Sequence, residues 1–235
     1  MVKWSNEDIK KRSGTMTDLN AQALEHMQKG EVEEAVKVLT EQIEKVPTDV
    51  VAYINFGNVL LSMGDVERAA RFYDRAIEID SNVPTVYYSY GNLYYQAQEY
   101  TKAAQKFQMA LEKGLDEADV YFMLGISLLN QGEAKLAMPY LLTATEKNPD
   151  DIEAWFQYAL VLAQLSLFDE AINAFNQVLA MDDTHADALY YLGTARLMNG
   201  EDSTIIKPLF EKVVTLQPEH EMALSALDAI TAYEK

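Results

Sequence analysis

The sequence predicts an all-α protein in which pairs of helices repeat along the chain, and three observations support this prediction. The stretch from Val50 to Ser81 recurs 34 residues later and again from Ala118, and a fixed period of this length is typical of helical repeat arrays. Within the stretch, apolar residues follow one another at intervals of three or four, which places them on one face of a helix. The segment Met63-Gly64-Asp65 separates two such sets and is typical of a turn.

Each repeat carries the same residue types at the same positions, counted with Val50 as position 1. Position 8 is small, at Gly57, Gly91, Gly125, Ala159 and Gly193. Position 20 is alanine, at Ala35, Ala69, Ala103, Ala137 and Ala171, and position 4 is aromatic, at Tyr53, Tyr87, Tyr121 and Trp155. Small residues allow the paired helices to approach closely. One pair cannot bury both of its faces alone, so we expect the pairs to stack into an array.

This pattern resembles the tetratricopeptide repeat (TPR) family, and the resemblance covers nearly the whole chain. It implies an all-α fold, a right-handed superhelical TPR solenoid of α-α hairpin repeats with a C-terminal capping helix, in a small all-TPR protein. We expect six repeats at residues 16–49, 50–83, 84–117, 118–151, 152–185 and 186–220, followed by the capping helix at 221–235. The sixth repeat contains one extra residue, which we place in the turn from Gly200 to Ser203.

Residues 1–15 precede the first repeat and do not match it, so we expect an N-terminal arm or a short lead-in helix there. This segment has four basic and two acidic side chains, so its net charge is +2. Because the whole chain has a net charge of −18, the remaining residues have a net charge of −20. Trp4 and Ile9 are large apolar residues within it. Three alternatives remain, namely a frayed end, a helix packed on the first repeat, and an arm that docks in the groove of a neighbouring molecule.

Composition favours a cytoplasmic protein that binds neither nucleic acid nor a membrane. A net charge of −18 would repel a phosphate backbone. No apolar run approaches the roughly 20 residues that a membrane-spanning helix needs, and the N-terminus lacks the apolar core of a secretory signal. Because there is no cysteine, disulfides and cysteine-based zinc sites are excluded. The acidic charge has two explanations, which are the solubility of a large surface and the attraction of a basic partner.

The resemblance implies that positions 2, 5, 9, 12 and 13 of the first helices line a concave groove that binds a peptide or a partner helix. The candidate groove residues are Asn55, Asn58, Tyr88, Asn92, Asp119, Phe122, Ile126, Leu129, Glu153, Phe156, Leu160, Asp187, Tyr190 and Leu197. Ile126 and Leu160 depart from the asparagine that the family usually has at position 9. The groove of repeats 4 to 6 is therefore expected to be apolar with an acidic rim. An exposed apolar patch rimmed by polar residues is typical of a binding site. Alternatively, these apolar side chains bury one another.

The expected function is that of a non-enzymatic scaffold for protein–protein interaction. Members of the family that grip a C-terminal carboxylate use Lys and Arg in the groove, and the candidate groove residues include neither. A partner segment with apolar anchors and basic residues would suit this groove better. Two alternatives remain. One is a self-associating structural protein, in which residues 1–15 or the C-terminal helix fill the groove of a neighbour. The other is an accessory subunit of a larger complex that docks through its convex face.

No residue pattern indicates catalysis. The three histidines lie in different repeats and lack the spacing of metal ligands. They are His26, His185 and His220. The chain has no glycine-rich phosphate loop and no nucleophile motif. We therefore expect no cofactor and no metal site.

The substitution Gly91→Leu tests the assignment of position 8. A large side chain would overpack the point where the paired helices approach most closely, which costs about 1–3 kcal/mol of folding free energy. We expect a lower melting temperature in circular dichroism. An unchanged melting temperature would show that the repeat has been counted in the wrong phase.

Overall fold

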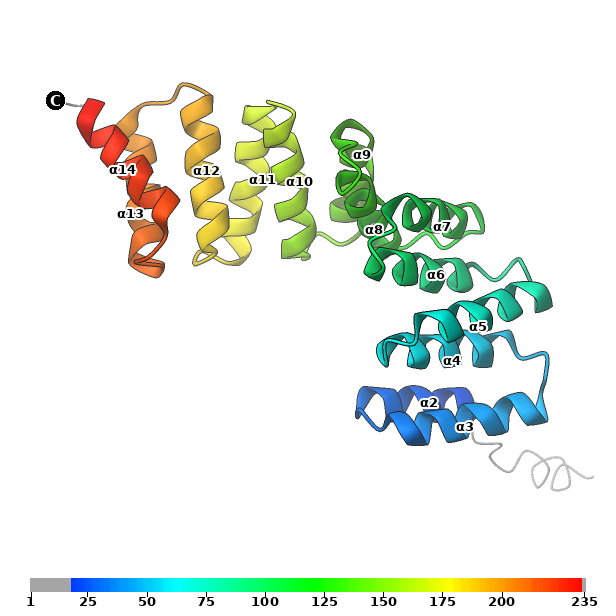
Figure 1. The fold of residues 1–235 in the computed structure, drawn as a ribbon. Helices are drawn as coiled ribbons and strands as arrows, with labels where there is room; N and C mark the ends of the chain where they lie inside the picture. Colours follow the sequence, from blue (N-terminus) through cyan, green and yellow to red (C-terminus); the bar gives the residue numbers. More distant parts are fainter. Residues whose placement is uncertain (1–17, 234–235) are drawn as a thin grey trace, which may run out of the picture. The chain divides into compact units, whose positions relative to one another are not determined.

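The computed structural model describes residues 18–233, which form thirteen α-helices and no β-strand (Figure 1). The helices are α2 (Leu19–Gln28), α3 (Val32–Lys45), α4 (Val50–Ser62), α5 (Val66–Ile79), α6 (Pro84–Gln96), α7 (Tyr100–Glu112), α8 (Ala118–Leu129), α9 (Ala134–Lys147), α10 (Ile152–Gln164), α11 (Phe168–Met181), α12 (Ala186–Met198), α13 (Ser203–Leu216) and α14 (Glu221–Tyr233). The all-α prediction is therefore confirmed. Residues 1–15, expected as an arm or lead-in helix, lie outside the described residues.

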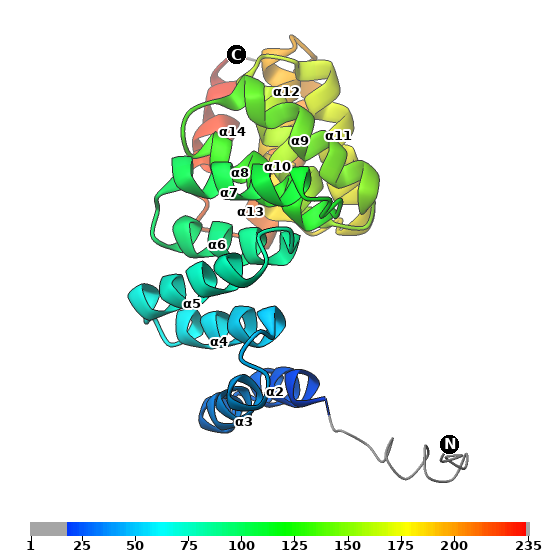
Figure 2. The same cartoon turned by 90° about the vertical axis from the view of Figure 1, so that its right-hand side faces the viewer.

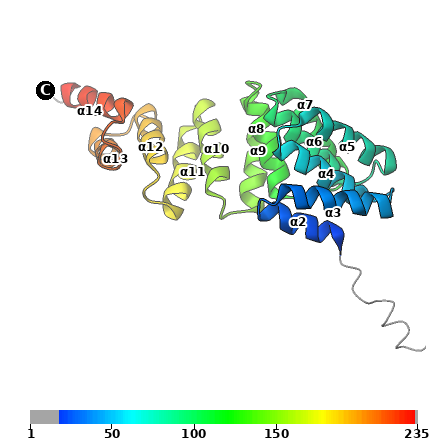
Figure 3. The same ribbon diagram turned by 60° about the horizontal axis from the view of Figure 1, so that its bottom comes forward.

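The chain divides into two compact units, one ending at Leu93 and the other beginning at Tyr94. In the first unit, α2 packs against α3, α3 against α4 and α4 against α5 (Figure 2). In the second unit, each helix from α7 to α14 packs against the next one along the chain (Figure 3). Contacts between sequence neighbours are what stacked helix pairs require. None of the described helices is long and apolar enough to cross a membrane.

Glycine at position 8 is required by the close approach of the two helices of a pair. In three repeats this glycine faces a large, almost completely buried side chain of the second helix. The pairs are Gly57 with Tyr73, Gly125 with Leu141 and Gly193 with Phe210. A Cβ atom at Gly57 would lie 2.4 Å from Cε1 of Tyr73, which is much shorter than any van der Waals contact. The small residue and the large residue therefore form one packing unit.

The turn inside each repeat uses a residue in the left-handed backbone region. Six residues spaced 34 apart have a positive φ, and they are Gly30, Gly64, Gln98, Gly132, Ser166 and Gly200. Four of them are glycine, which adopts this region without steric cost. Gln98 and Ser166 adopt it with φ of 59° and 62°, which strains a residue that carries a Cβ atom.

Replacing Ser166 by glycine should relieve this strain. We expect Ser166→Gly to raise the free energy of unfolding by about 0.5–1 kcal/mol, after allowing for the greater freedom of glycine in the unfolded chain. The reverse change at the equivalent position, Gly132→Ser, should lower it by a similar amount. Urea denaturation measures both. Equal stability of all three proteins would contradict a strained turn.

Asp49 joins three helices of the first unit. Its carboxylate caps α4 by accepting hydrogen bonds from the N–H groups of Val51 and Ala52. It also accepts from Nδ2 of Asn20 at 2.8 Å and from Nε2 of Gln42 at 2.5 Å. Burial alone would raise the pKa of Asp49, but the hydrogen bonds from these groups outweigh it and hold the pKa below its usual value.

The neutral variant Asp49→Asn should lower the free energy of unfolding at pH 7 by about 1–2 kcal/mol. The NH₂ group of the new amide would face Nδ2 of Asn20 and Nε2 of Gln42, which are donors as well. The folded pKa of Asp49 is depressed, so its contribution is present above the unfolded pKa of about 3.9 and is lost as the pH falls through the folded value. The difference between the two proteins should shrink below about pH 4. Thermal unfolding from pH 3 to pH 7 measures it, with the exposed Glu44→Gln as control. A constant difference across this range would contradict the expectation.

Two irregularities distinguish the end of the second unit. Two residues, Glu201 and Asp202, lie between the positive-φ residue Gly200 and the start of α13. Only one residue lies between Gly132 and the start of α9, and only one between Ser166 and the start of α11. The extra residue of repeat 6 thus lies in the turn after Gly200. The second irregularity is α14, which packs on α13 at the place expected for the capping helix.

Candidate binding surface

The first helices of the repeats lie on one side of the second unit. α8 contacts α10, and α10 contacts α12, whereas within residues 94–233 no comparable contact joins α9 with α11 or α11 with α13. The row of helices is therefore tighter on the side of α8, α10 and α12. The predicted groove residues of repeats 4 to 6 lie on these three helices.

On α8, the candidate residues divide between the core and the surface. Ile126 is only 9% exposed and belongs to a hydrophobic cluster with Leu141 and Val161. Phe122 and Leu129 are half-buried and pack beside that cluster. Asp119, in the first turn of the helix, is exposed.

On α10, Phe156 is also only 9% exposed, because rings from three other segments surround it. Its ring centroid lies 4.9 Å from that of His185 and about 6 Å from those of Phe175 and Tyr191. Leu160 is half-buried beside the same cluster. Glu153 is exposed and accepts a hydrogen bond from Nε2 of Gln157 at 2.7 Å.

On α12, the apolar candidates are more open. Tyr190 is half-buried, with its ring 5.0 Å from His220 and 5.8 Å from Phe210. Asp187 is exposed in the first turn. Leu197, near the end of the helix, is 49% exposed.

Some of the candidate groove residues are thus buried by neighbouring side chains, as the alternative interpretation expected. Ile126 and Phe156 are core residues in this structure. Among the candidates on α8, α10 and α12, those that a ligand can reach are Phe122, Leu129, Leu160, Tyr190 and Leu197, together with the carboxylates of Asp119, Glu153 and Asp187.

The candidates of the first unit are polar. Asn55 and Asn58 on α4, and Tyr88 and Asn92 on α6, are all half-buried. The hydroxyl group of Tyr73 donates a hydrogen bond of 2.7 Å to Oδ1 of Asn58. Burial raises the pKa of Tyr73, so its hydroxyl stays protonated and can donate. The amide of Asn58 is thereby held in one orientation, with its Nδ2 group as the donor.

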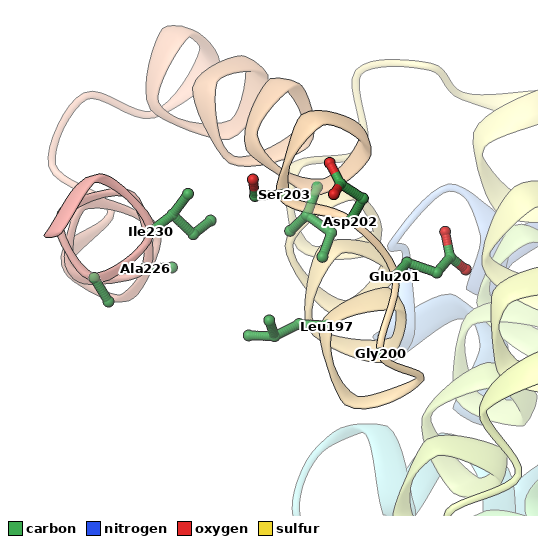
Figure 4. A pocket seen from close by; sticks show the side chains of 9 residues that line it. Leu197, Gly200, Glu201, Asp202, Ser203, Ala226 and Ile230 are labelled. Atoms are coloured by element: carbon green, nitrogen blue, oxygen red, sulfur yellow. The ribbon is translucent and has the colours of Figure 1, made fainter. Parts of the chain in front are cut away.

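A cavity near the C-terminal end was not predicted from the sequence. It has a volume of about 500 Å³ and lies between α12, α13 and α14 (Figure 4). Its lining residues are Leu197, Gly200, Glu201, Asp202, Ser203, Ile206, Ala226, Ala229 and Ile230. Only Leu197 was a candidate groove residue. The extra residue of the sixth repeat was a signal for this site, because the lengthened turn forms one of its walls. Within residues 18–233, no cluster of three or more His, Asp or Glu residues could hold a metal ion.

Comparison with known proteins identifies the family. A family model described as a TPR repeat matches residues 57–98, and another described as a tetratricopeptide repeat matches residues 122–174 and 159–221. The solved structure of YrrB, described as a TPR protein with an unusual peptide-binding site, is 39% identical in sequence. The match covers 80% of this chain and 96% of YrrB, with a TM-score of 0.75. The chain belongs to the tetratricopeptide repeat family.

More distant TPR structures share the fold alone. PilF of Pseudomonas aeruginosa is 19% identical over 90% of this chain and 95% of its own, with a TM-score of 0.76. PilW, described as a type IV pilus biogenesis factor, is 16% identical over 89% and 96% of the two chains, with a TM-score of 0.71. No curated protein matches the chain. The fold is thus an all-α TPR solenoid, and members of this family typically serve as protein-interaction modules.

Proposed function

We propose that this TPR protein is a scaffold that binds a peptide segment or a helix of a partner protein on the surface formed by α8, α10 and α12. The observation that carries the proposal is the row of half-buried apolar side chains on these helices, flanked by exposed carboxylates. Apolar surface that neighbours do not cover is typical of a binding site. The similar protein YrrB, a TPR protein with an unusual peptide-binding site, supports the same role.

The chemistry of the surface suggests the kind of partner. Phe122, Leu160 and Tyr190 offer apolar contacts along three successive helices. The carboxylates of Asp119, Glu153 and Asp187 repeat at position 2 of the same helices. A segment with apolar anchors and with Lys or Arg beside them would match both features. We propose no catalytic step and no cofactor for this surface.

Selection of random 12-residue peptides displayed on phage against the immobilised full chain tests this proposal. The selected peptides should combine aliphatic or aromatic residues with Lys or Arg. Their Kd, measured by fluorescence anisotropy, should rise at least about tenfold in the variant Phe122→Ala/Leu160→Ala, because truncation of two anchors typically costs more than about 1.4 kcal/mol of binding free energy.

The matched control is Leu136→Ala/Met181→Ala, which removes two exposed apolar side chains from the second helices α9 and α11. Circular dichroism verifies that both variants fold. Equal loss of binding in the control, or unchanged binding in the variant of α8 and α10, would place the binding surface on another face of the protein.

A further inference from the structure

The packing beside α14 differs from the packing between α8 and α10 and between α10 and α12. At both of those places, position 12 of one first helix belongs to the same hydrophobic cluster as position 10 of the next first helix. The two pairs are Leu129 with Val161 and Ala163 with Ala195. The equivalent residues at the end of the array are Leu197 and Ile230, and they line opposite walls of the cavity instead (Figure 4).

The turn between α12 and α13 keeps the space between Leu197 and Ile230 open. Two residues, Glu201 and Asp202, separate Gly200 from α13, whereas Leu167 alone separates Ser166 from α11. Gly200, Glu201 and Asp202 all line the cavity. Leu197 is consequently 49% exposed, and the neighbouring Met198 and Ile205 are exposed as well. The apolar space between Leu197 and Ile230 is therefore not filled by other side chains of the described residues.

The surroundings of the cavity are acidic. Residues 186–233 contain seven carboxylates and three basic side chains, a net charge of −4. One of the basic residues, Arg196, pairs with Glu201 at 2.5 Å. Hydrogen bonds from the hydroxyl group and the N–H group of Thr204 lower the pKa of Asp202, so this carboxylate at the cavity is ionised at neutral pH. A ligand for this site would therefore combine an apolar group with positive charge.

Residues 1–15 of the chain have this chemistry. Trp4 and Ile9 are large apolar residues, Lys10, Lys11 and Arg12 follow directly, and the segment has a net charge of +2. A cavity of about 500 Å³ is within the range of roughly 300–1,000 Å³ that accommodates small ligands, so it is large enough for an indole ring.

We propose that residues 1–15 of one copy dock into the cavity between α12, α13 and α14 of a second copy, with Trp4 between Leu197 and Ile230. In the sequence, residues 1–15 precede α2, and the cavity is lined by residues 197–230. Each copy thus has one such segment and one such cavity. Association is head to tail, which yields rings or open chains.

Photocrosslinking of the full chain tests this assignment directly. The variant carries p-benzoylphenylalanine in place of Trp4, and equal amounts of unlabelled and ¹⁵N-labelled protein are mixed before irradiation. We expect mass spectrometry to find crosslinks to cavity residues such as Leu197 or Ile230, and to find them between labelled and unlabelled copies. Crosslinks only within one copy, crosslinks on α8 or α10, or none at all would overturn the proposal.

Sedimentation velocity with a matched pair of variants gives an independent test. Ala229→Glu places a carboxylate at an exposed lining position, and Ser225→Glu places the same group at an exposed position of α14 outside the cavity lining. Ala229→Glu should weaken self-association at least about tenfold, because burying the added carboxylate would be unfavourable, while Ser225→Glu should have no effect. Self-association of the unchanged chain should also weaken between low and high salt. A chain that stays monomeric at all concentrations, or equal association of both variants, would refute it.

Discussion

The contact between a glycine on the first helix and a large side chain on the second determines how closely three of the helix pairs can pack. At Gly57 the ring of Tyr73 occupies the space of a Cβ atom, and Gly125 and Gly193 make the same approach to Leu141 and Phe210. Tyr73, Leu141 and Phe210 are nearly fully buried by these contacts. The opposite faces of the two helices can then pack against the neighbouring pair. The row of first helices, and with it the candidate binding surface, depends on this spacing.

Acidic residues serve structure as well as surface charge. Asp49, Asp151 and Asp202 each accept hydrogen bonds from backbone N–H groups at the start of a helix. Carboxylates at these places are favoured by the helix dipole and satisfy donors that no helical carbonyl reaches. Part of the net charge of −18 is thus accounted for without a partner. Asp119, Glu153 and Asp187 also lie in first turns, but their side chains are exposed.

The fold was predictable from the sequence because its signals are local: the apolar spacing, the small residues at position 8 and the turn glycines all act within one repeat. The left-handed conformations of Gln98 and Ser166 were not predicted, because glutamine and serine are not typical of positions with a positive φ. The burial of Phe156 depends on the rings of Phe175 on α11, of His185 and of Tyr191 in the next repeat, so position 5 alone could not indicate it. The cavity depends on Ile230 failing to reach Leu197, which is a matter of how α14 packs and not of residue type.

The packing of each helix against its immediate successor has a consequence for how the protein folds. Stabilising contacts form between residues that are close in sequence, so little chain entropy is lost before each contact is made. A pair such as α4 and α5 can therefore form early and serve as a template for its neighbours on either side.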